Sequence, residues 1–276
     1  GIDAAAKARR TAEALIKRTE ALLAGQNKAG WRGTHVEVIG AEASYGARAR
    51  VHDPREVLLK IIVDHDDPAA AALFGREQST AILNMAQGTS IAPIVAAPRA
   101  FPLTGMMLFL LDKGHAVARV TLDGVEVPFR DAELAGFHAD LIAPHPVSAP
   151  PEPRADDVAV PLIALAFARS GDKGRLFNVG VIARQAEFLP FIRAALTPEA
   201  VTDVYGEMFD DPASRRVDRY DAPGFAALNF VVHDAQGGGI NTSPRFDAAA
   251  KSMAQHLLEM PVRIPAALAA RLEQGN

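Results

Sequence analysis

The stretch "FARSGDKGRLFNVGVIAR" (Phe167–Arg184) places a charged, glycine-flanked segment, Ser170–Gly174, between two apolar runs. The apolar run that precedes it, "VAVPLIALAFA" (158–168), predicts a strand. We interpret Ser170–Gly174 as a turn in which this strand ends and a helix begins. Because backbone N–H groups at a helix start lack partners and the helix dipole favours negative charge, the turn is predicted to bind an anion.

The residue types within this turn fit that interpretation only in part. Gly171 and Gly174 would let a ligand approach the backbone closely, and Lys173 adds a positive charge. Asp172 repels an anion, so it could instead orient Lys173, act as a base or cap the helix. The alternative is an ordinary turn with a solvated Asp–Lys pair. The spacing matches neither a P-loop nor GxGxxG, so a nucleotide is not indicated.

A second candidate site lies in "LNFVVHDAQGGGINTSPRFD" (228–247), a predicted strand followed by a glycine-rich loop. Asn229 and His233 are evenly spaced and should point to one face of the strand. His233 is then either a satisfied core histidine or an acid/base group. Arg245 could hold a carboxylate or phosphate, or be a surface arginine. We expect the loop 236–243 to meet the Ser170–Gly174 turn if the two preceding strands run parallel.

Composition excludes several classes of protein. The 276 residues include no cysteine, which removes disulfides, zinc-thiolate sites and cysteine nucleophiles. The net charge is −4 and no basic tract stands out, so nucleic acid and anionic membranes are not expected partners. The most apolar run, "PLTGMMLFLL" (102–111), is about half the length of a membrane span. We expect a cytoplasmic protein.

Neither a metal nor a cofactor is expected. The chain has no HExxH motif, no EF-hand loop and no GxSxG elbow. The acidic segment "VDHDDP" (63–68) contains carboxylate and imidazole groups of the kind that bind metals. Neighbouring residues of a strand point to opposite faces, however, so these groups would not converge on one ion. A solvated strand end is the better interpretation.

The remaining pattern predicts an α/β (α+β) protein. Up to residue 129 we expect helices at 3–25 and 67–88, strands at 34–43 and 56–67, and a hairpin at 114–129 with Asp123–Gly124 in its turn. A proline-rich linker at 143–157 separates a mixed α/β part, 1–142, from residues 158–276. In that second part, helices at 187–209 and 247–260, the latter capped by Asp247, and a strand at 223–234 suggest an α+β sandwich.

Three segments, "RSGDKGRLFNVGVIAR", "LNFVVHDAQGGGINTSPRFD" and "KSMAQHLLEMPV", together resemble the C-terminal ferredoxin-like domain of the acyclic terpene utilization (AtuA-type) family. The likeness covers most of Val160–Pro265, and one departure is Arg175, where a small or acidic residue is expected. Residues before the linker resemble the later part of the family's N-terminal domain, which suggests a fragment, a split subunit or a shortened relative. The positions that carry the likeness are Ser170–Gly174, Asn178, Gly180, Arg184, Asn229, Phe230, Gly237–Gly239, Arg245, Asp247 and Lys251.

The resemblance implies breakdown of branched, acyclic carbon skeletons as coenzyme A thioesters. We expect a hydratase- or lyase-type enzyme, or a catalytic subunit, that acts on an acyl-CoA or a related carboxylate. The alternative is a non-catalytic subunit or assembly partner of an acyl-CoA-processing complex. A partial N-terminal domain should expose apolar surface, so a homo-oligomer or hetero-oligomer is expected.

The expected roles divide into catalysis and substrate binding. Asp172 or His233 would move the proton, Lys173 would face the developing oxyanion, and Asn229 would orient one of them. The substrate would be held by residues of the turn, the following strand and the glycine loop: Ser170, Gly171, Gly174, Asn178, Gly237, Gly238, Gly239 and Arg245.

Overall fold

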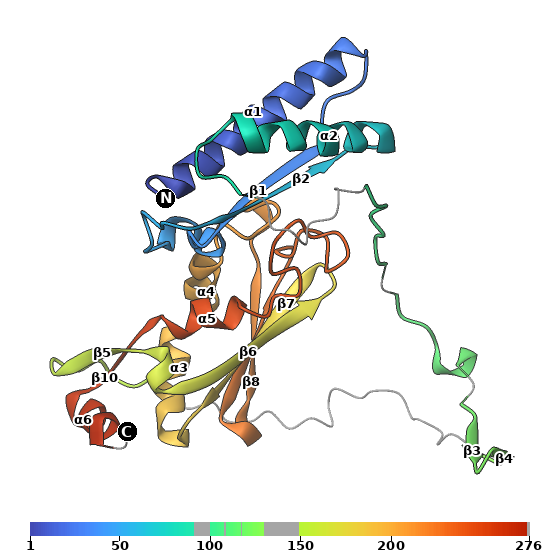
Figure 1. The fold of residues 1–276 in the computed structure, drawn as a ribbon. Coiled ribbons are helices and arrows are strands. Elements are labelled where there is room, and N and C mark those ends of the chain that lie inside the picture. The colour runs from blue at the N-terminus through green and yellow to red at the C-terminus, as the bar shows by residue number, and fades with distance from the viewer. Residues whose placement is uncertain (91–99, 108, 117, 130–148, 275–276) are drawn as a thin grey trace.

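The computed structural model describes residues 1–90, 100–107, 109–116, 118–129 and 149–274. Its N-terminal unit is an antiparallel strand pair with two helices on one side (Figure 1). The elements are α1 (Ala4–Gly25), β1 (Gly33–Ile39), β2 (Leu58–Asp64) and α2 (Pro68–Asn84). All four elements were predicted from sequence, α2 from Pro68 as its start and Gly88 as its end, although α2 ends four residues before Gly88.

Capping residues explain where α2 begins, and backbone conformation explains where the exposed hairpin turns. The Asp67 carboxylate accepts a hydrogen bond from the Ala69 N–H at 2.8 Å, and Pro68 occupies the first helical turn, where no N–H is needed. In the hairpin of β3 (Val120–Leu122) and β4 (Val125–Val127), Asp123 and Gly124 have φ of 50° and 80°. Two positive φ values are what a type I′ turn needs, so the predicted hairpin is confirmed.

The predicted single strand over 158–168 is wrong. It is two strands, β5 (Asp157–Pro161) and β6 (Ala166–Lys173), separated by a 3-10 turn. β5 pairs with β10 (Pro261–Pro265) in a separate two-stranded sheet. Of the expected linker, residues 143–148 lie outside the described residues, and 149–156 have no regular helix or strand.

The interpretation of Ser170–Gly174 as the start of a helix is also wrong. β6 continues to Lys173, and a two-residue turn leads directly into β7 (Leu176–Ala183). Gly174 has φ of +73° at the first position of this turn, where hairpins of type II′ favour glycine. The alternation of "LFNVGVIA" buries Phe177, Val179 and Val181, and this period of two is the signal for a strand. The predicted anion site therefore does not lie at the start of a helix that continues from this turn.

The second half of the chain is built on a four-stranded antiparallel sheet with the order β6-β7-β9-β8. β9 (Ala227–Val232) was predicted, whereas β8 (Val217–Ala222) was not. α3 (Leu189–Ala195), α4 (Pro198–Val204) and α5 (Met253–Leu258) pack on one face of this sheet, and α6 (Ala266–Gln274) follows β10. The result is the expected α+β sandwich.

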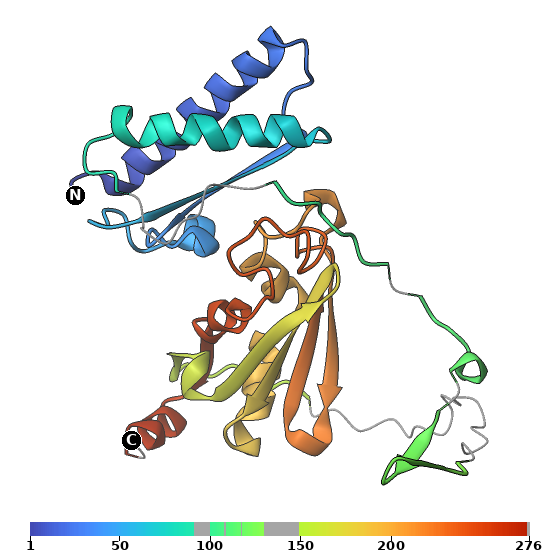
Figure 2. The same cartoon turned by 45° about the vertical axis from the view of Figure 1, so that its right-hand side comes forward.

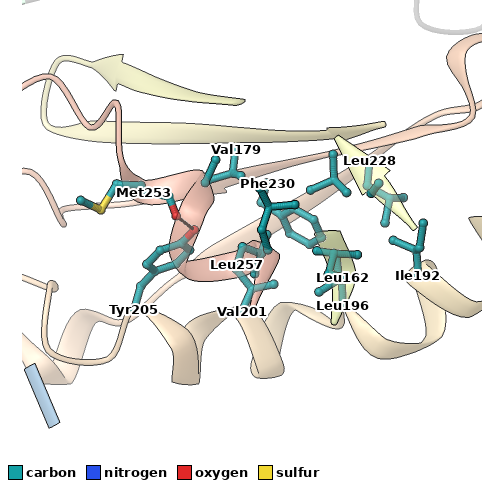
Figure 3. Packing of buried hydrophobic residues seen from close by; sticks show 14 of the residues in the cluster. Leu162, Val179, Ile192, Leu196, Val201, Tyr205, Leu228, Phe230, Met253 and Leu257 are labelled. Carbon is teal, nitrogen blue, oxygen red and sulfur yellow. Dashed lines mark hydrogen bonds between the residues drawn. The ribbon is translucent and has the colours of Figure 1, made fainter. Parts of the chain in front are cut away.

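The core between sheet and helices is shown in Figure 3. Val179 and Phe230 project from the sheet toward Val201 and Leu257 of the helices, and all four are buried. The Tyr205 hydroxyl donates to the Met253 carbonyl at 2.8 Å, so the one buried phenol in this core has a partner.

Asp247 does not cap a helix that starts beside it, because α5 begins only at Met253. Its carboxylate instead accepts hydrogen bonds from the N–H groups of Lys251 and Ser252, at 2.8 and 2.7 Å. The Ser170 hydroxyl accepts from the Ala254 N–H at 2.9 Å, within the first turn of α5. Two side chains from outside the helix therefore satisfy the N–H groups at and just before its start.

The N-terminal unit meets the second half of the chain along a polar seam. Tyr45, in a 3-10 helix after β1, stacks on His256 of α5 with ring centroids 4.1 Å apart. Arg48 places Nη2 3.2 Å from His256 Nδ1. His256 is 1% exposed, and its burial, together with the nearby Arg48 charge, lowers its pKa to about 4.

A second set of contacts in the seam fixes the end of the glycine loop. Glu37 of β1 accepts from the Phe246 N–H at 3.0 Å, and the Lys60 ammonium donates to the Pro244 carbonyl at 2.6 Å. Burial alone would raise the pKa of Glu37, but hydrogen bonds from His35, Phe246 and Lys60 outweigh it and lower the pKa to about 2. Glu37 is therefore charged at neutral pH while it holds the loop.

Acidification should weaken the fold through His256. Between pH 6.5 and about 4 the unfolded chain binds a proton that folded His256 does not, so the free energy of unfolding should fall by up to about 3 kcal/mol. Urea unfolding at pH 7.5 and 4.5 measures this loss. The pH-dependent loss should be smaller in His256→Gln and unchanged in His52→Gln, which alters an exposed histidine. Equal losses in the wild type and His256→Gln would contradict the explanation.

Candidate functional site

The face of the four-stranded sheet opposite the helices is uncovered in Figures 1 and 2, and we call it the open face. Strand register fixes which residues share it. One cross-strand row contains Arg169, Gly180, Asn229 and Tyr220, in the order β6-β7-β9-β8. The next row contains Gly171, Asn178, Val231 and Asp218. These residues alternate with the buried core positions of the same strands.

An amide pair occupies the middle of the open face. Asn178 Nδ2 donates to Asn229 Oδ1 at 2.9 Å, from β7 to β9. This bond uses one donor of Asn178 and one acceptor of Asn229, which leaves the Asn178 oxygen and the Asn229 NH₂ group for a ligand. Both residues were predicted from sequence as parts of the site, and the structure places them in contact.

His233 lies at the loop end of the same face. Its Nε2 is 2.9 Å from Oδ2 of Asp218, and the backbone N–H of His233 donates to the Arg216 carbonyl. Arg216 donates to both Asp218 oxygens, at 3.0 and 2.6 Å. The Arg216 hydrogen bonds, aided by His233, hold the pKa of Asp218 below its usual range.

This arrangement assigns the proton on His233. Because ionised Asp218 can only accept, Nε2 of neutral His233 carries the hydrogen and Nδ1 keeps a free lone pair. The His233 side chain is 25% exposed, so His233 is not a fully buried core histidine, and it shares a face with Asn229 as its even spacing predicted. Asp218 was missed from sequence, because nothing marked 217–222 as a strand beside β9.

Gly171 and Gly180 present no side chain on the open face, and we call the region of these two glycines, together with Arg169, Lys173 and Lys251, the glycine hollow. A Cβ built on Gly171 would stand 3.0 Å from the Lys251 ammonium and 3.8 Å from that of Lys173. A Cβ on Gly180 would have only the Arg169 carbonyl near it, at 4.0 Å. In the sequence, Lys251 stood out only as one of the positions that carry the family resemblance, because it is remote along the chain from Arg169 and Lys173.

The glycine loop and the β6–β7 turn meet, as expected. β6 and β9 are both antiparallel to β7 and therefore parallel to each other, so their following loops leave the same edge of the sheet. A Cβ on Gly239 would stand 3.1 Å from the Gly174 carbonyl oxygen. Gly237, Gly238 and Gly239 have φ of 62°, 86° and 108°, a region that favours glycine.

Comparison with protein families places both halves of the chain. The family model described as "Acyclic terpene utilisation family protein AtuA" matches residues 1–122, and that described as "AtuA ferredoxin-like domain" matches residues 160–263. The chain belongs to the AtuA family. No curated protein and no solved structure matches it. Membership of a terpene-utilisation family supports a catabolic role.

The ferredoxin-like domain of this AtuA-family chain contains the whole open face, but other predicted site residues have contacts elsewhere. Strand alternation puts Asp172 on the side of Ser170, which faces α5, and the Asp172 N–H donates to the Ala249 carbonyl at 3.0 Å. Arg245 donates to the carbonyls of Ala235 and Met208. Burial lowers the Arg245 pKa. These contacts hold loops together.

Two hollows in the described part of the AtuA-family chain lie away from the open face. One of about 240 Å³ lies along the seam beside Tyr45 and Glu259. Another, of about 490 Å³, lies beside His65 and the predicted solvated strand end. There Arg32 pairs with Asp64 and Asp66, and in the described part of the chain no three His, Asp or Glu residues could hold a metal ion.

Within the ranges that the structure describes, no helix is long and apolar enough to cross a bilayer.

Gly239→Ala should destabilise the AtuA ferredoxin-like domain by about 1–3 kcal/mol, because a methyl group would strain the backbone at φ +108° and crowd the Gly174 carbonyl. Gly224→Ala is the matched control, since a Cβ there meets nothing within 4 Å and its φ is not positive. Thermal and urea unfolding of both variants measure the difference. Equal stability of the two would show that the loops do not depend on this contact.

Proposed function

We propose that the open face is the catalytic surface of an enzyme that acts on a branched, acyclic acyl-CoA or a related carboxylate by hydratase or lyase chemistry. The observation that carries the proposal is the shared placement of a base, His233 fixed by Asp218, and of donors, Lys173 and the Asn229 amide, on one face. Family membership supports the catabolic setting.

The open face suits proton transfer next to a thioester carbonyl. His233 Nδ1 takes the proton from the carbon beside the carbonyl, and the electron pair of that C–H bond becomes an enolate. The negative charge on the carbonyl oxygen is stabilised by the Lys173 ammonium or the Asn229 NH₂. A hydroxyl on the next carbon then leaves with the proton from the imidazolium, so an alkene and water form and no co-reactant is needed.

The spacing of strands fits a substrate that lies across β7. Adjacent strands are about 4.8 Å apart, so Lys173 on β6 and His233 beyond β9 are separated by roughly 10 Å. A ligand between them passes the Asn178–Asn229 pair. Asp172 faces the helices by alternation, so His233 is the better supported of the two predicted bases.

Turnover of a panel of branched acyl-CoA thioesters and their free acids tests the proposal. His233→Gln should lower kcat by about 10²–10⁴-fold with little change in KM, because it removes a proton-transfer group. Asp218→Asn should lower kcat less, and His115→Gln, outside the open face, should not change it. A wild-type chain inactive on the whole panel, or unimpaired turnover by His233→Gln, would contradict the assignment.

Exposed apolar residues favour a second function, assembly with a partner. Met107, Phe109 and Leu110 are 82%, 72% and 103% exposed, and the described residues 100–107 and 109–112 form no helix or strand. Surface of this kind is usually covered in a complex.

We expect sedimentation velocity to show a self-associated species whose fraction rises with protein concentration, because burying these side chains removes apolar surface from water. Leu110→Lys should reduce association, whereas Lys17→Ala on α1 should not. A monomer at every concentration would exclude self-association as the role of this segment.

A further inference from the structure

The glycine hollow concentrates positive charge that the chain does not neutralise. Arg169, Lys173 and Lys251 have no carboxylate partner among the residues that the structure describes. By contrast, nearby Arg175 pairs with Asp234, and Arg216 pairs with Asp218. The two acids closest in sequence are directed elsewhere: Asp172 faces the helices, and Asp247 binds backbone N–H groups.

Gly171 has no backbone reason to be glycine. Its φ is not in the left-handed region, and the β6–β7 register runs through it without a bulge. A glycine in the interior of a strand weakens the strand, and it is found where something must approach the backbone closely. What approaches Gly171 is the pair of lysine ammonium groups, within 3.8 Å of where a Cβ would stand.

The two ammonium groups that approach Gly171 repel each other, and an anion bound between them would offset that repulsion. Lys173 Nζ donates only to the Asp172 carbonyl, at 2.9 Å, so both lysines keep donors for a ligand. Lysine acts on phosphate as a point charge, and arginine contacts it bidentately. A monoanionic carboxylate would leave most of this charge unpaired, whereas a phosphate or pyrophosphate group matches it.

We propose that the glycine hollow binds a phosphate group of a coenzyme A-type ligand through Lys173, Lys251 and Arg169. This rests on the proposed function, and it selects the thioester over the free acid as the substrate. A phosphate at Gly171 lies at the β6 edge of the open face and engages Lys173, so the Asn229 NH₂ is the donor that faces the thioester carbonyl oxygen. The remainder of the ligand then extends across β7 toward Asn229 and His233.

Calorimetric titration of the full chain with free coenzyme A, inorganic pyrophosphate and pantetheine tests the site without requiring turnover. Coenzyme A and pyrophosphate should bind, more weakly as salt rises, and pantetheine should not. Lys173→Ala and Lys251→Ala should each weaken pyrophosphate binding by about tenfold, the usual effect of losing a charged hydrogen bond. Lys17→Ala, an equal loss of charge on α1, should leave it unchanged.

Gly171→Ala tests the hollow without removing a charge. Its methyl group would stand 3.0 Å from the Lys251 ammonium, which must move, while the strand backbone accepts alanine. We expect weaker pyrophosphate binding with an unchanged circular dichroism spectrum. Failure of wild type to bind pyrophosphate, or binding unaltered by all three variants in the hollow, would overturn the proposal.

The two proposals fail in different ways. A chain that binds pyrophosphate in the hollow but turns over no thioester keeps the phosphate site and loses the catalytic role. A chain that turns over thioesters with the same KM in wild type and Lys251→Ala keeps the catalytic role and loses the phosphate site.

Discussion

The alternation of β7 is the constraint on which the rest of the C-terminal half depends. Phe177, Val179 and Val181 are buried against the helices, so Asn178 and Gly180 must face the other way. A shift of register by one residue would bury the amide and expose the aromatic ring. The same pleat that forms the core therefore also presents the polar groups of the open face.

Glycines near this sheet act in two different ways. Gly174 and Gly239 allow a turn and a loop to touch, with positive φ at both positions. Gly171 and Gly180 lie within strands and present no side chain on the open face, where the Lys251 ammonium lies against Gly171. The first kind shapes the edge where the two loops meet, and the second makes room for charged side chains on the open face.

The N-terminal unit contacts the glycine loop, which packs at the edge of the sheet where the β6–β7 turn lies. Glu37 and Lys60 hold the backbone at Phe246 and Pro244, a few residues beyond the glycines that pack on the β6–β7 turn. The two halves recognised as AtuA-family sequence are thus connected next to the open face. The chemistry proposed for the domain depends on a loop that the other half helps to position.

The sequence by itself determined the elements with a clear period and their turns: α1, α2, β9, the Asp123–Gly124 hairpin, and the α+β class with its family. It also marked Lys173, Asn178, Asn229 and His233. It misjudged Ser170–Gly174, because a glycine-flanked turn after a strand leads equally well into a helix or a second strand. Only the tertiary structure decided that. Lys251 and Asp218 joined the site through strand pairing and loop packing, contacts between segments remote in the chain that no local pattern records.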